Sequence, residues 1–263
     1  MSSVDPIWDS IREEAAELSQ KEPVLKRFFD EAVLVHQCFD TAISYNLSRP
    51  IANSTVDMEQ LRTVILEAIH ADAGIGRSIR LDINAAFQRD AACQQYLMPL
   101  IYFKGFQALQ LHRVAHWLWH ENRRELALFI QNRISEKFAV DIHPAAKLGS
   151  GIMIDHATGL VIGETAVVGD NVSIMHSVTL GGSGCTVGDR HPKIGNGVLI
   201  SAGAKVLGNI SVGDGAKIGA GSLVLEPVPD HVTVAGVPAS IVGRPTEDSP
   251  ALEMDQSIEQ KES

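Results

Sequence analysis

The sequence predicts an α+β fold, with an N-terminal α-helical domain followed by a C-terminal parallel β-helix of hexapeptide repeats. Apolar residues of the N-terminal half recur with a helical period, whereas an aliphatic residue returns every six positions in the C-terminal half. A six-residue unit cannot bury its own apolar side chain, so successive turns must stack into one internal column. The repeats form three runs: Ile142, Leu148, Ile154, Leu160; Ile162, Val168, Ile174, Leu180; and Ile194, Ile200, Val206, Val212, Ile218, Val224.

A break in the repeat predicts a projecting loop. Fourteen residues separate Leu180 from Ile194, which is not a multiple of six. The interval starts glycine-rich at residues 181–184 and continues with the ionisable run 189–193. Loops that project from a rigid scaffold are where function is expected.

Helix signals mark the first half of the chain. Asp5 followed by Pro6 predicts an N-cap and a first helical position, and Pro23 should close that helix. We expect a second helix over 25–49, ending before Pro50, and a third beginning at an Asp57 cap. Gly74 and Gly76 should interrupt that third helix, with helical structure resuming toward residue 90 and again over 99–134.

Three regions follow from these patterns. Residues 1–140 form an α-helical domain, whose surplus of apolar faces predicts packing against copies of itself. Residues 141–245 form the β-helix, expected to be catalytic. Residues 246–263 are rich in acids and serines, which predicts a flexible C-terminal tail.

Composition excludes several classes of partner. A net charge of -10 and a pI near 5.4 argue against nucleic acid and anionic membranes, which would repel the chain. Cysteines are few, odd in number and widely spaced, as suits a reducing cytosol (Cys38, Cys93 and Cys185). No secretory leader or membrane-spanning stretch is recognisable, so we expect a cytoplasmic protein.

His156 is the strongest candidate for catalysis. It follows Asp155, two positions beyond the inward-facing Ile154, so it need not lie inside the column. A neutral imidazole can take a hydroxyl proton at neutral pH, and a carboxylate from Asp141 or Asp155 can orient it. The chain has no Gly-x-Ser-x-Gly elbow, and Cys185 has no recognisable basic partner. The residues therefore favour direct transfer between two bound substrates.

Five motifs together with the repeat closely resemble those of the serine O-acetyltransferase family. They are residues 155–159 (DHATG), 163–166 (GETA), 177–182 (SVTLGG), 188–193 (GDRHPK) and 235–239 (AGVPA), and the resemblance spans about residues 5–245. It implies a left-handed β-helix, an exception to the usual right-handed crossover.

The resemblance also implies roles for individual residues. His156 would deprotonate the L-serine hydroxyl, with Asp141 orienting it, and the alkoxide would attack acetyl-CoA. Acetyl-CoA is a cosubstrate, and no resident cofactor or metal is implied. The implied binding residues are Arg190 and His191 for the serine carboxylate; Asp90 and Asp155 for its ammonium; Gly182, Ala202 and Ala220 for the thioester arm; and Lys193 and Lys217 for the CoA phosphates.

The same resemblance implies an assembly and a mode of regulation. Three β-helices would form a trimer, and the helical halves would join two trimers into a hexamer, so that each active site needs two chains. L-cysteine would inhibit from the serine site. Relatives that dock onto cysteine synthase end in isoleucine, whereas this chain ends in Ser263, which argues against that complex.

Other readings use the same residues. A γ-type zinc carbonic anhydrase is an alternative, because four histidines fall in the β-helix, although they lack the expected His-x4-His pair (His143, His156, His176 and His191). His112, His116 and His120 have helical spacing that could chelate a metal, but their apolar neighbours favour a packed helix. A different hydroxyl acceptor, such as homoserine, and a non-catalytic scaffold also remain open.

Overall fold

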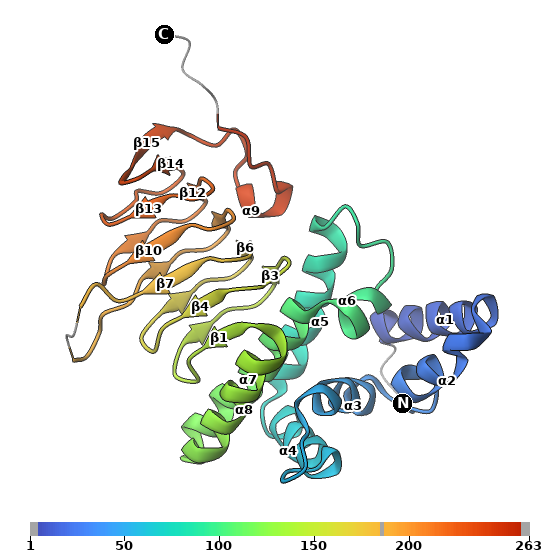
Figure 1. Cartoon of the computed structure of the whole chain (residues 1–263). Helices are drawn as coiled ribbons and strands as arrows, with labels where there is room; N and C mark the ends of the chain where they lie inside the picture. Colours follow the sequence, from blue (N-terminus) through green and yellow to red (C-terminus); the bar gives the residue numbers. More distant parts are fainter. Residues whose placement is uncertain (1–4, 185–186, 259–263) are drawn as a thin grey trace.

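The computed structural model describes residues 5–184 and 187–258, and it joins a helical half to a stack of short strands (Figure 1). The helices pack against the first coils of the stack, and residues 239–243 lie at its other end. Residues 250–253 return along the side of the stack and contact the helical half. Cys185, and the chain end on which the cysteine synthase prediction depends, lie outside the described residues. No helix in the described ranges is long and apolar enough to cross a membrane.

The helices confirm the predicted caps. Asp5 accepts a hydrogen bond from the Trp8 amide at 3.3 Å, and Asp57 forms a capping box with Gln60. The described helical segments are α1 Pro6–Lys21, η1 Pro23–Leu25, α2 Lys26–Phe29, η2 Asp30–Leu34, α3 Phe39–Ile51, α4 Met58–Ala71, α5 Ala73–Arg89, α6 Leu97–Tyr102, α7 Lys104–His120 and α8 Arg124–Phe138.

Two helix predictions were wrong. The helix expected over 25–49 is broken into short 3-10, α and π turns before α3. In the break, the His36 carbonyl accepts a hydrogen bond from the Arg12 guanidinium at 2.8 Å, which stabilises the non-helical backbone there. Pro50 lies inside the last turn of α3 and does not follow it. The break after α4 falls at Asp72, which caps α5 through the Gly74 amide, so the glycines belong to the first turn of α5.

The strands wind as a parallel β-helix with three sheets. From β1 to β10 each strand pairs in parallel with the strand three places later, and β12 pairs in parallel with β14. The orders are β1-β4-β7-β10-β13, β2-β5-β8-β11 and β3-β6-β9-β12-β14, and β15 adds antiparallel to β14. The strands are β1 Val140–Ile142, β2 Lys147–Leu148, β3 Met153–Ile154, β4 Leu160–Ile162, β5 Val167–Val168, β6 Ser173–Ile174, β7 Thr179–Gly181, β8 Lys193–Ile194, β9 Leu199–Ile200, β10 Lys205–Leu207, β11 Ser211–Val212, β12 Lys217–Ile218, β13 Leu223–Val224, β14 Thr233–Gly236 and β15 Ala239–Gly243.

The six-residue repeat builds the predicted internal columns. In the first sheet the paired inward positions are Ile142, Ile162, Leu180, Val206 and Val224, and each is at most 2% exposed. Burying one such side chain contributes roughly 1.5–3 kcal/mol. The stacked anchors therefore supply the core that a single repeat cannot.

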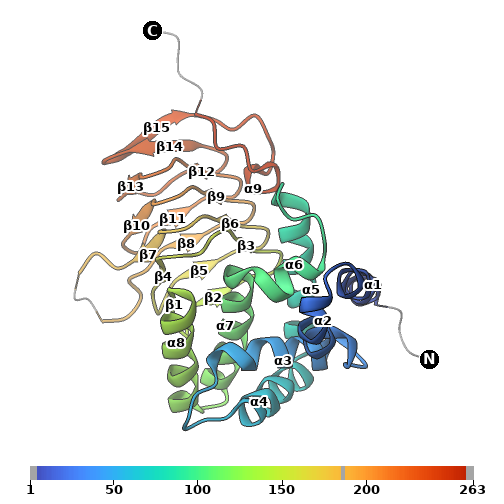
Figure 2. The same ribbon diagram turned by 45° about the vertical axis from the view of Figure 1, so that its right-hand side comes forward.

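The phase break in the repeat is a loop, as expected. The described residues between β7 and β8, 182–184 and 187–192, project sideways from the coil (Figure 2). The ionisable run, residues 189–193, is the last part of this loop, and its final residue, Lys193, begins β8. The loop therefore returns Arg190 and His191 to the body of the protein.

The segment expected to be a mobile tail differs from that expectation. Residues 250–253 form helix α9 (Pro250–Glu253), and Ala251 is completely buried. Ser173 of β6 donates to the Ala251 carbonyl at 2.7 Å, which ties α9 to the β-helix. The apolar residues Pro250 and Ala251 are too few to stand out in the sequence, yet they suffice to dock this turn.

Candidate functional site

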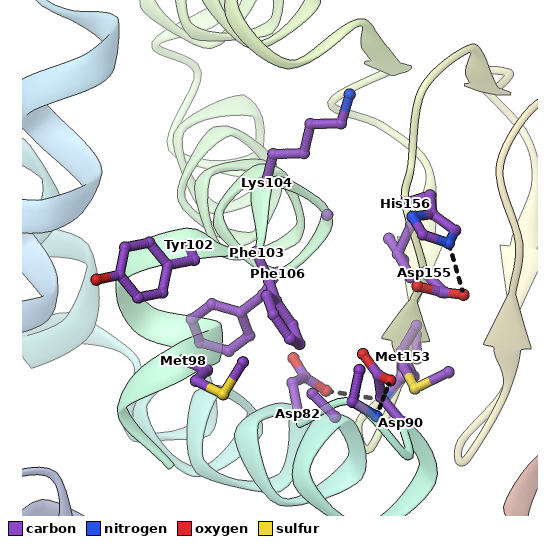
Figure 3. A pocket seen from close by; sticks show the side chains of 15 residues that line it. Asp82, Asp90, Met98, Tyr102, Phe103, Lys104, Phe106, Met153, Asp155 and His156 are labelled. Carbon is purple, nitrogen blue, oxygen red and sulfur yellow. Dashed lines mark hydrogen bonds and ion pairs between the residues drawn. The ribbon is translucent and has the colours of Figure 1, made fainter. Parts of the chain in front are cut away.

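A pocket of about 360 Å³ lies where the helical half meets the first coil (Figure 3). The end of α5, the segment 98–106 of α6 and α7, and the end of β3 with its following turn supply its walls. Its apolar side chains include Met98, Tyr102, Phe103, Phe106 and Met153. Its polar side chains are Asp82, Asp90, Lys104, Asp155 and His156.

His156 stands on a sharp turn at the mouth of this pocket. The turn follows β3, and both His156 and Ala157 adopt left-handed backbone angles, with φ of 55° and 61°. The imidazole is 72% exposed, and its Nε2 lies 3.7 Å from Asp155 Oδ2. The ring is thus accessible to a substrate and close to a carboxylate, as a general base requires.

Asp90 reaches the same pocket from the helical half. It is the C-cap of α5, and its Oδ1 accepts from the Ala92 amide at 2.8 Å, which fixes the side chain. The fold thus brings Asp90, Asp155 and His156 into one pocket although Asp90 belongs to the other half of the chain. Two carboxylates beside an imidazole suit a small ligand that carries an ammonium and a hydroxyl.

Arg190 and His191 form a second cluster, which we call the arginine corner. It consists of Glu164, Thr165, Arg190 and His191. Arg190 Nη2 donates to Glu164 Oε2 at 2.7 Å, and the Thr165 amide donates to His191 Nδ1 at 3.1 Å. The Arg190 hydrogen bond lowers the pKa of Glu164, whereas burial, followed by the Arg190 charge, lowers the pKa of His191. Along the chain these groups come after strands of the first sheet, β4 and β7, whereas His156 comes before β4. The two clusters therefore occupy different corners of the coil.

Glycine at position 163 makes the arginine corner possible. A Cβ built there would lie 2.1 Å from the His191 ring, so only glycine lets that ring rest on the backbone. His191 is 7% exposed as a result. Gly163, the first residue of the GETA motif, therefore lets the His191 ring pack directly against the backbone.

Asp141 lies between the two corners, on the outer surface of the first sheet. Its Oδ1 accepts from Gln131 Nε2 of α8 at 2.7 Å. Within the described ranges, no hydrogen bond or ion pair joins Asp141 to His156 of the same chain. The outward positions paired along this sheet are Asp141, Val161, Thr179, Lys205 and Leu223.

The residues expected to bind CoA divide into two groups. Ala202 and Ala220 lie on the corner of His156, two and three coils further on. There the Gly203 amide donates to the His176 backbone carbonyl, and the Gly221 amide donates to the Ala202 backbone carbonyl. Gly182 lies beside Arg190, because a Cβ built on it would be 3.5 Å from the Arg190 carbonyl. The corner that runs from His156 to Ala220 therefore has small side chains at Ala202 and Ala220, which leave the backbone accessible along the stack.

The two lysines expected at the phosphates are engaged elsewhere. Lys193 Nζ donates to Asp189 Oδ1 at 2.5 Å and to two backbone carbonyls. Lys217 is 3% exposed beneath the C-terminal segment, with Nζ 3.5 Å from Asp255 Oδ2. Neither lysine presents a free ammonium in this conformation, because Asp189 and two carbonyls engage Lys193 and the C-terminal segment covers Lys217. The sequence did not show that folded segments would cover them.

The helical wall of the pocket was not found from the sequence. Lys104, Gly105 and Phe106 line it from the first turn of α7, where an apolar run reads only as a helix face. Asp82 was also missed, and its carboxylate is completely buried beside Arg113. A glycine inside an apolar helical run is the one signal that could have drawn attention to position 105.

Histidines do not gather into a metal centre in the part of the chain that the structure describes. Residues 5–184 and 187–258 contain no group of three or more His, Cys, Asp or Glu side chains placed to hold a metal ion. His112 is 2% exposed in the core of α7, while His116 and His120 each place Nδ1 2.8 Å from a backbone carbonyl oxygen. The carbonic anhydrase alternative therefore gains no support.

Comparisons with known proteins decide the family. A family model described as the N-terminal region of serine acetyltransferase matches residues 7–111, and a bacterial transferase hexapeptide model matches residues 191–226. A serine acetyltransferase of Salmonella typhimurium is 55% identical over 250 residues, covering 95% of this chain and 92% of its own. The chain belongs to the serine acetyltransferase family.

Solved serine acetyltransferases share the fold. One in complex with cysteine is 51% identical, covers 95% of this chain and 98% of its own, and superposes with a TM-score of 0.93. Another, from Brucella abortus in complex with coenzyme A, is 51% identical with a TM-score of 0.90, covering 92% of this chain and 96% of its own. The predicted fold class, a helical region followed by a left-handed β-helix, is confirmed.

Proposed function

We propose that this serine acetyltransferase moves the acetyl group of acetyl-CoA to the hydroxyl of L-serine, which gives O-acetylserine and CoA. The observation that carries the proposal is the meeting of His156 with Asp155 and Asp90 in one pocket beside an exposed corner of the coil. The name of the 55% identical relative and the coenzyme A complex of another support the two substrates.

His156 would act as the general base. Its neutral imidazole takes the proton of the serine hydroxyl as the oxygen attacks the thioester carbonyl. The tetrahedral intermediate then collapses, the carbon–sulfur bond breaks, and the imidazolium returns the proton to the CoA thiolate. Protons and electrons balance without a covalent acyl-enzyme or a redox partner.

Asp90 and Asp155 would recognise the substrate ammonium. Both carboxylates line the pocket near His156, so an α-ammonium held between them places the serine side chain beside the imidazole. Charge-assisted hydrogen bonds of this kind are short and specific. The same contacts would accept L-cysteine, which fits the solved relative in complex with cysteine and supports inhibition from the serine site.

A neighbouring chain would complete the site. The His156 corner and the arginine corner flank the first sheet on its two sides. If three chains pack with this sheet toward a threefold axis, the His156 corner of one chain meets the arginine corner of the next. Arg190 could then pair with the serine carboxylate, and Asp141, on the sheet between the corners, would lie near the imidazole that it is expected to orient.

The pantetheine arm of CoA would run along the corner from His156 toward Ala220. Ala202 and Ala220 leave room for close approach, and the neighbouring chain would close the groove near Gly182. A hexamer built through the helical halves and a cytoplasmic location are part of the same proposal.

A thiol-release assay tests the function. The full chain should release CoA from acetyl-CoA with L-serine and much more slowly with homoserine. The variant His156→Ala should lose roughly a hundredfold or more in kcat, which is the usual scale for a lost general base. His70→Ala, at an exposed position of α4, is the control. Near-normal turnover in His156→Ala would reject the assignment.

A further inference from the structure

Helix α7 begins directly against the turn that carries His156. Its first residue, Lys104, hydrogen-bonds through Nζ to Thr158 Oγ1. Its second residue, Gly105, lies so close that an added Cβ would be 2.2 Å from the Ile154 carbonyl oxygen and 3.1 Å from the Ala157 Cβ. No side chain fits at position 105 while the turn keeps its place.

The turn is a conformation that needs external support. His156 and Ala157 are consecutive non-glycine residues in the left-handed region, which such residues rarely adopt. Strained backbone of this kind persists only where the surroundings determine it, and it clusters at functional sites. Ala157 is completely buried, so the contact with α7 is part of those surroundings.

We propose that Gly105 is a positioning residue for the general base. By admitting the first turn of α7 to direct contact with residues 154–157, it fixes the left-handed turn and thereby the direction of the His156 imidazole toward Asp155. The inference rests on the proposed function of His156. Gly105 acts through the turn and takes no part in the bond-making steps.

The variant Gly105→Ala tests the proposal in the full chain. The new methyl group must displace the turn, because a backbone oxygen and a buried Cβ block it. A misplacement of about 1 Å typically costs on the order of a hundredfold in rate, so kcat should fall about tenfold to a hundredfold. The KM for acetyl-CoA should stay within about twofold, and the acidic limb of the kcat/KM profile for serine should shift, because the imidazole changes its neighbours.

Gly76→Ala is a matched control in α5. A Cβ built on Gly76 would meet Arg80 Nη1 at 3.5 Å and Ile69 Cγ2 at 3.9 Å, which are ordinary contacts. This variant should keep kcat within about twofold of the parent. A purely structural role for Gly105 would lower only the melting temperature, and kcat and the pH profile of the folded protein would match those of the parent.

A second variant decides the matter if Gly105→Ala does not fold. Lys104→Met removes the hydrogen bond to Thr158 and inserts no atom against the turn. A fall of about threefold or more in kcat at an unchanged melting temperature supports the proposal. Parent-like kcat in a folded Gly105→Ala overturns the proposal. If Gly105→Ala does not fold, parent-like kcat in Lys104→Met overturns it. An inactive parent chain would instead reject the proposed function and this inference with it.

Discussion

Asp82 and Arg113 form an ion pair of 2.7 Å that is almost completely buried between α5 and α7. The other carboxylate oxygen of Asp82 accepts from the Ile152 amide at 2.9 Å, and Arg113 donates to the Gly149 carbonyl at 2.7 Å. Burial raises the pKa of Asp82, and the Arg113 charge acts against that rise. The pair therefore fastens both helices to the coil that carries His156.

Removing the cation of this pair should destabilise the protein strongly. Arg113→Met leaves the Asp82 carboxylate buried without a counter-ion, and breaking a buried pair typically costs about 3–5 kcal/mol. Urea unfolding followed by circular dichroism measures the change. The control is Arg77→Met, at an exposed position of α5, which should stay within about 0.5 kcal/mol of the parent. If Arg113→Met lowers the free energy of unfolding by less than about 1 kcal/mol, the ion pair does not hold the helices to the coil.

Asp90→Ala should weaken serine binding selectively. The lost carboxylate removes a charge-assisted hydrogen bond to the ammonium, which is worth about 1.5–3 kcal/mol, so the KM for serine should rise about tenfold to a hundredfold. The KM for acetyl-CoA should stay within about twofold. Steady-state kinetics with each substrate varied in turn provide the measurement, with Asp9→Ala, at an exposed position of α1, as control. Equal effects on both KM values would place Asp90 outside the serine site.

Burial of His112 should make stability depend on pH. Burial, followed by the charges of His116 and Arg113, lowers the pKa of His112 well below 6.5. Below pH 6.5 the unfolded chain binds a proton that the folded chain refuses, so stability falls as pH falls, by up to about 1.4 kcal/mol per pH unit. Above that pH the group contributes no slope.

The variant His112→Leu should remove this slope. Urea unfolding at pH 7.5 and pH 5.5 should show a difference in stability smaller than that of the parent by about 1 kcal/mol. His70→Leu, at an exposed position, should leave the slope unchanged. A parent-like slope in His112→Leu would show that other groups cause the loss at low pH.

Periodic and local features of the fold could be predicted from the sequence. The inward columns follow from a repeat in which each anchor contacts its counterpart one coil away, as Ile162 contacts Leu180. The caps at Asp5 and Asp57 depend on residues within one turn, so they too were visible. The handedness of the coil came from the family resemblance, because a period of six residues fits either hand.

Features set by contacts between distant segments could not be predicted. The break before α3 depends on Arg12 meeting the His36 carbonyl, and the cover over Lys217 depends on the segment around Asp255. At the site, the motifs and the resemblance indicated Asp90, Asp155 and His156. The contact of Gly105 with the His156 turn joins residues about fifty positions apart, and no pattern in the sequence records it.

Subunit complementation tests most directly whether His156 and Arg190 serve one site from two chains. The variants His156→Ala and Arg190→Ala should each be nearly inactive alone. In randomly mixed trimers about one quarter of the interfaces carry both intact halves, so co-refolded subunits should recover roughly a quarter of the parent activity. Activity that never exceeds the sum of the two separate variants would contradict a site shared between chains.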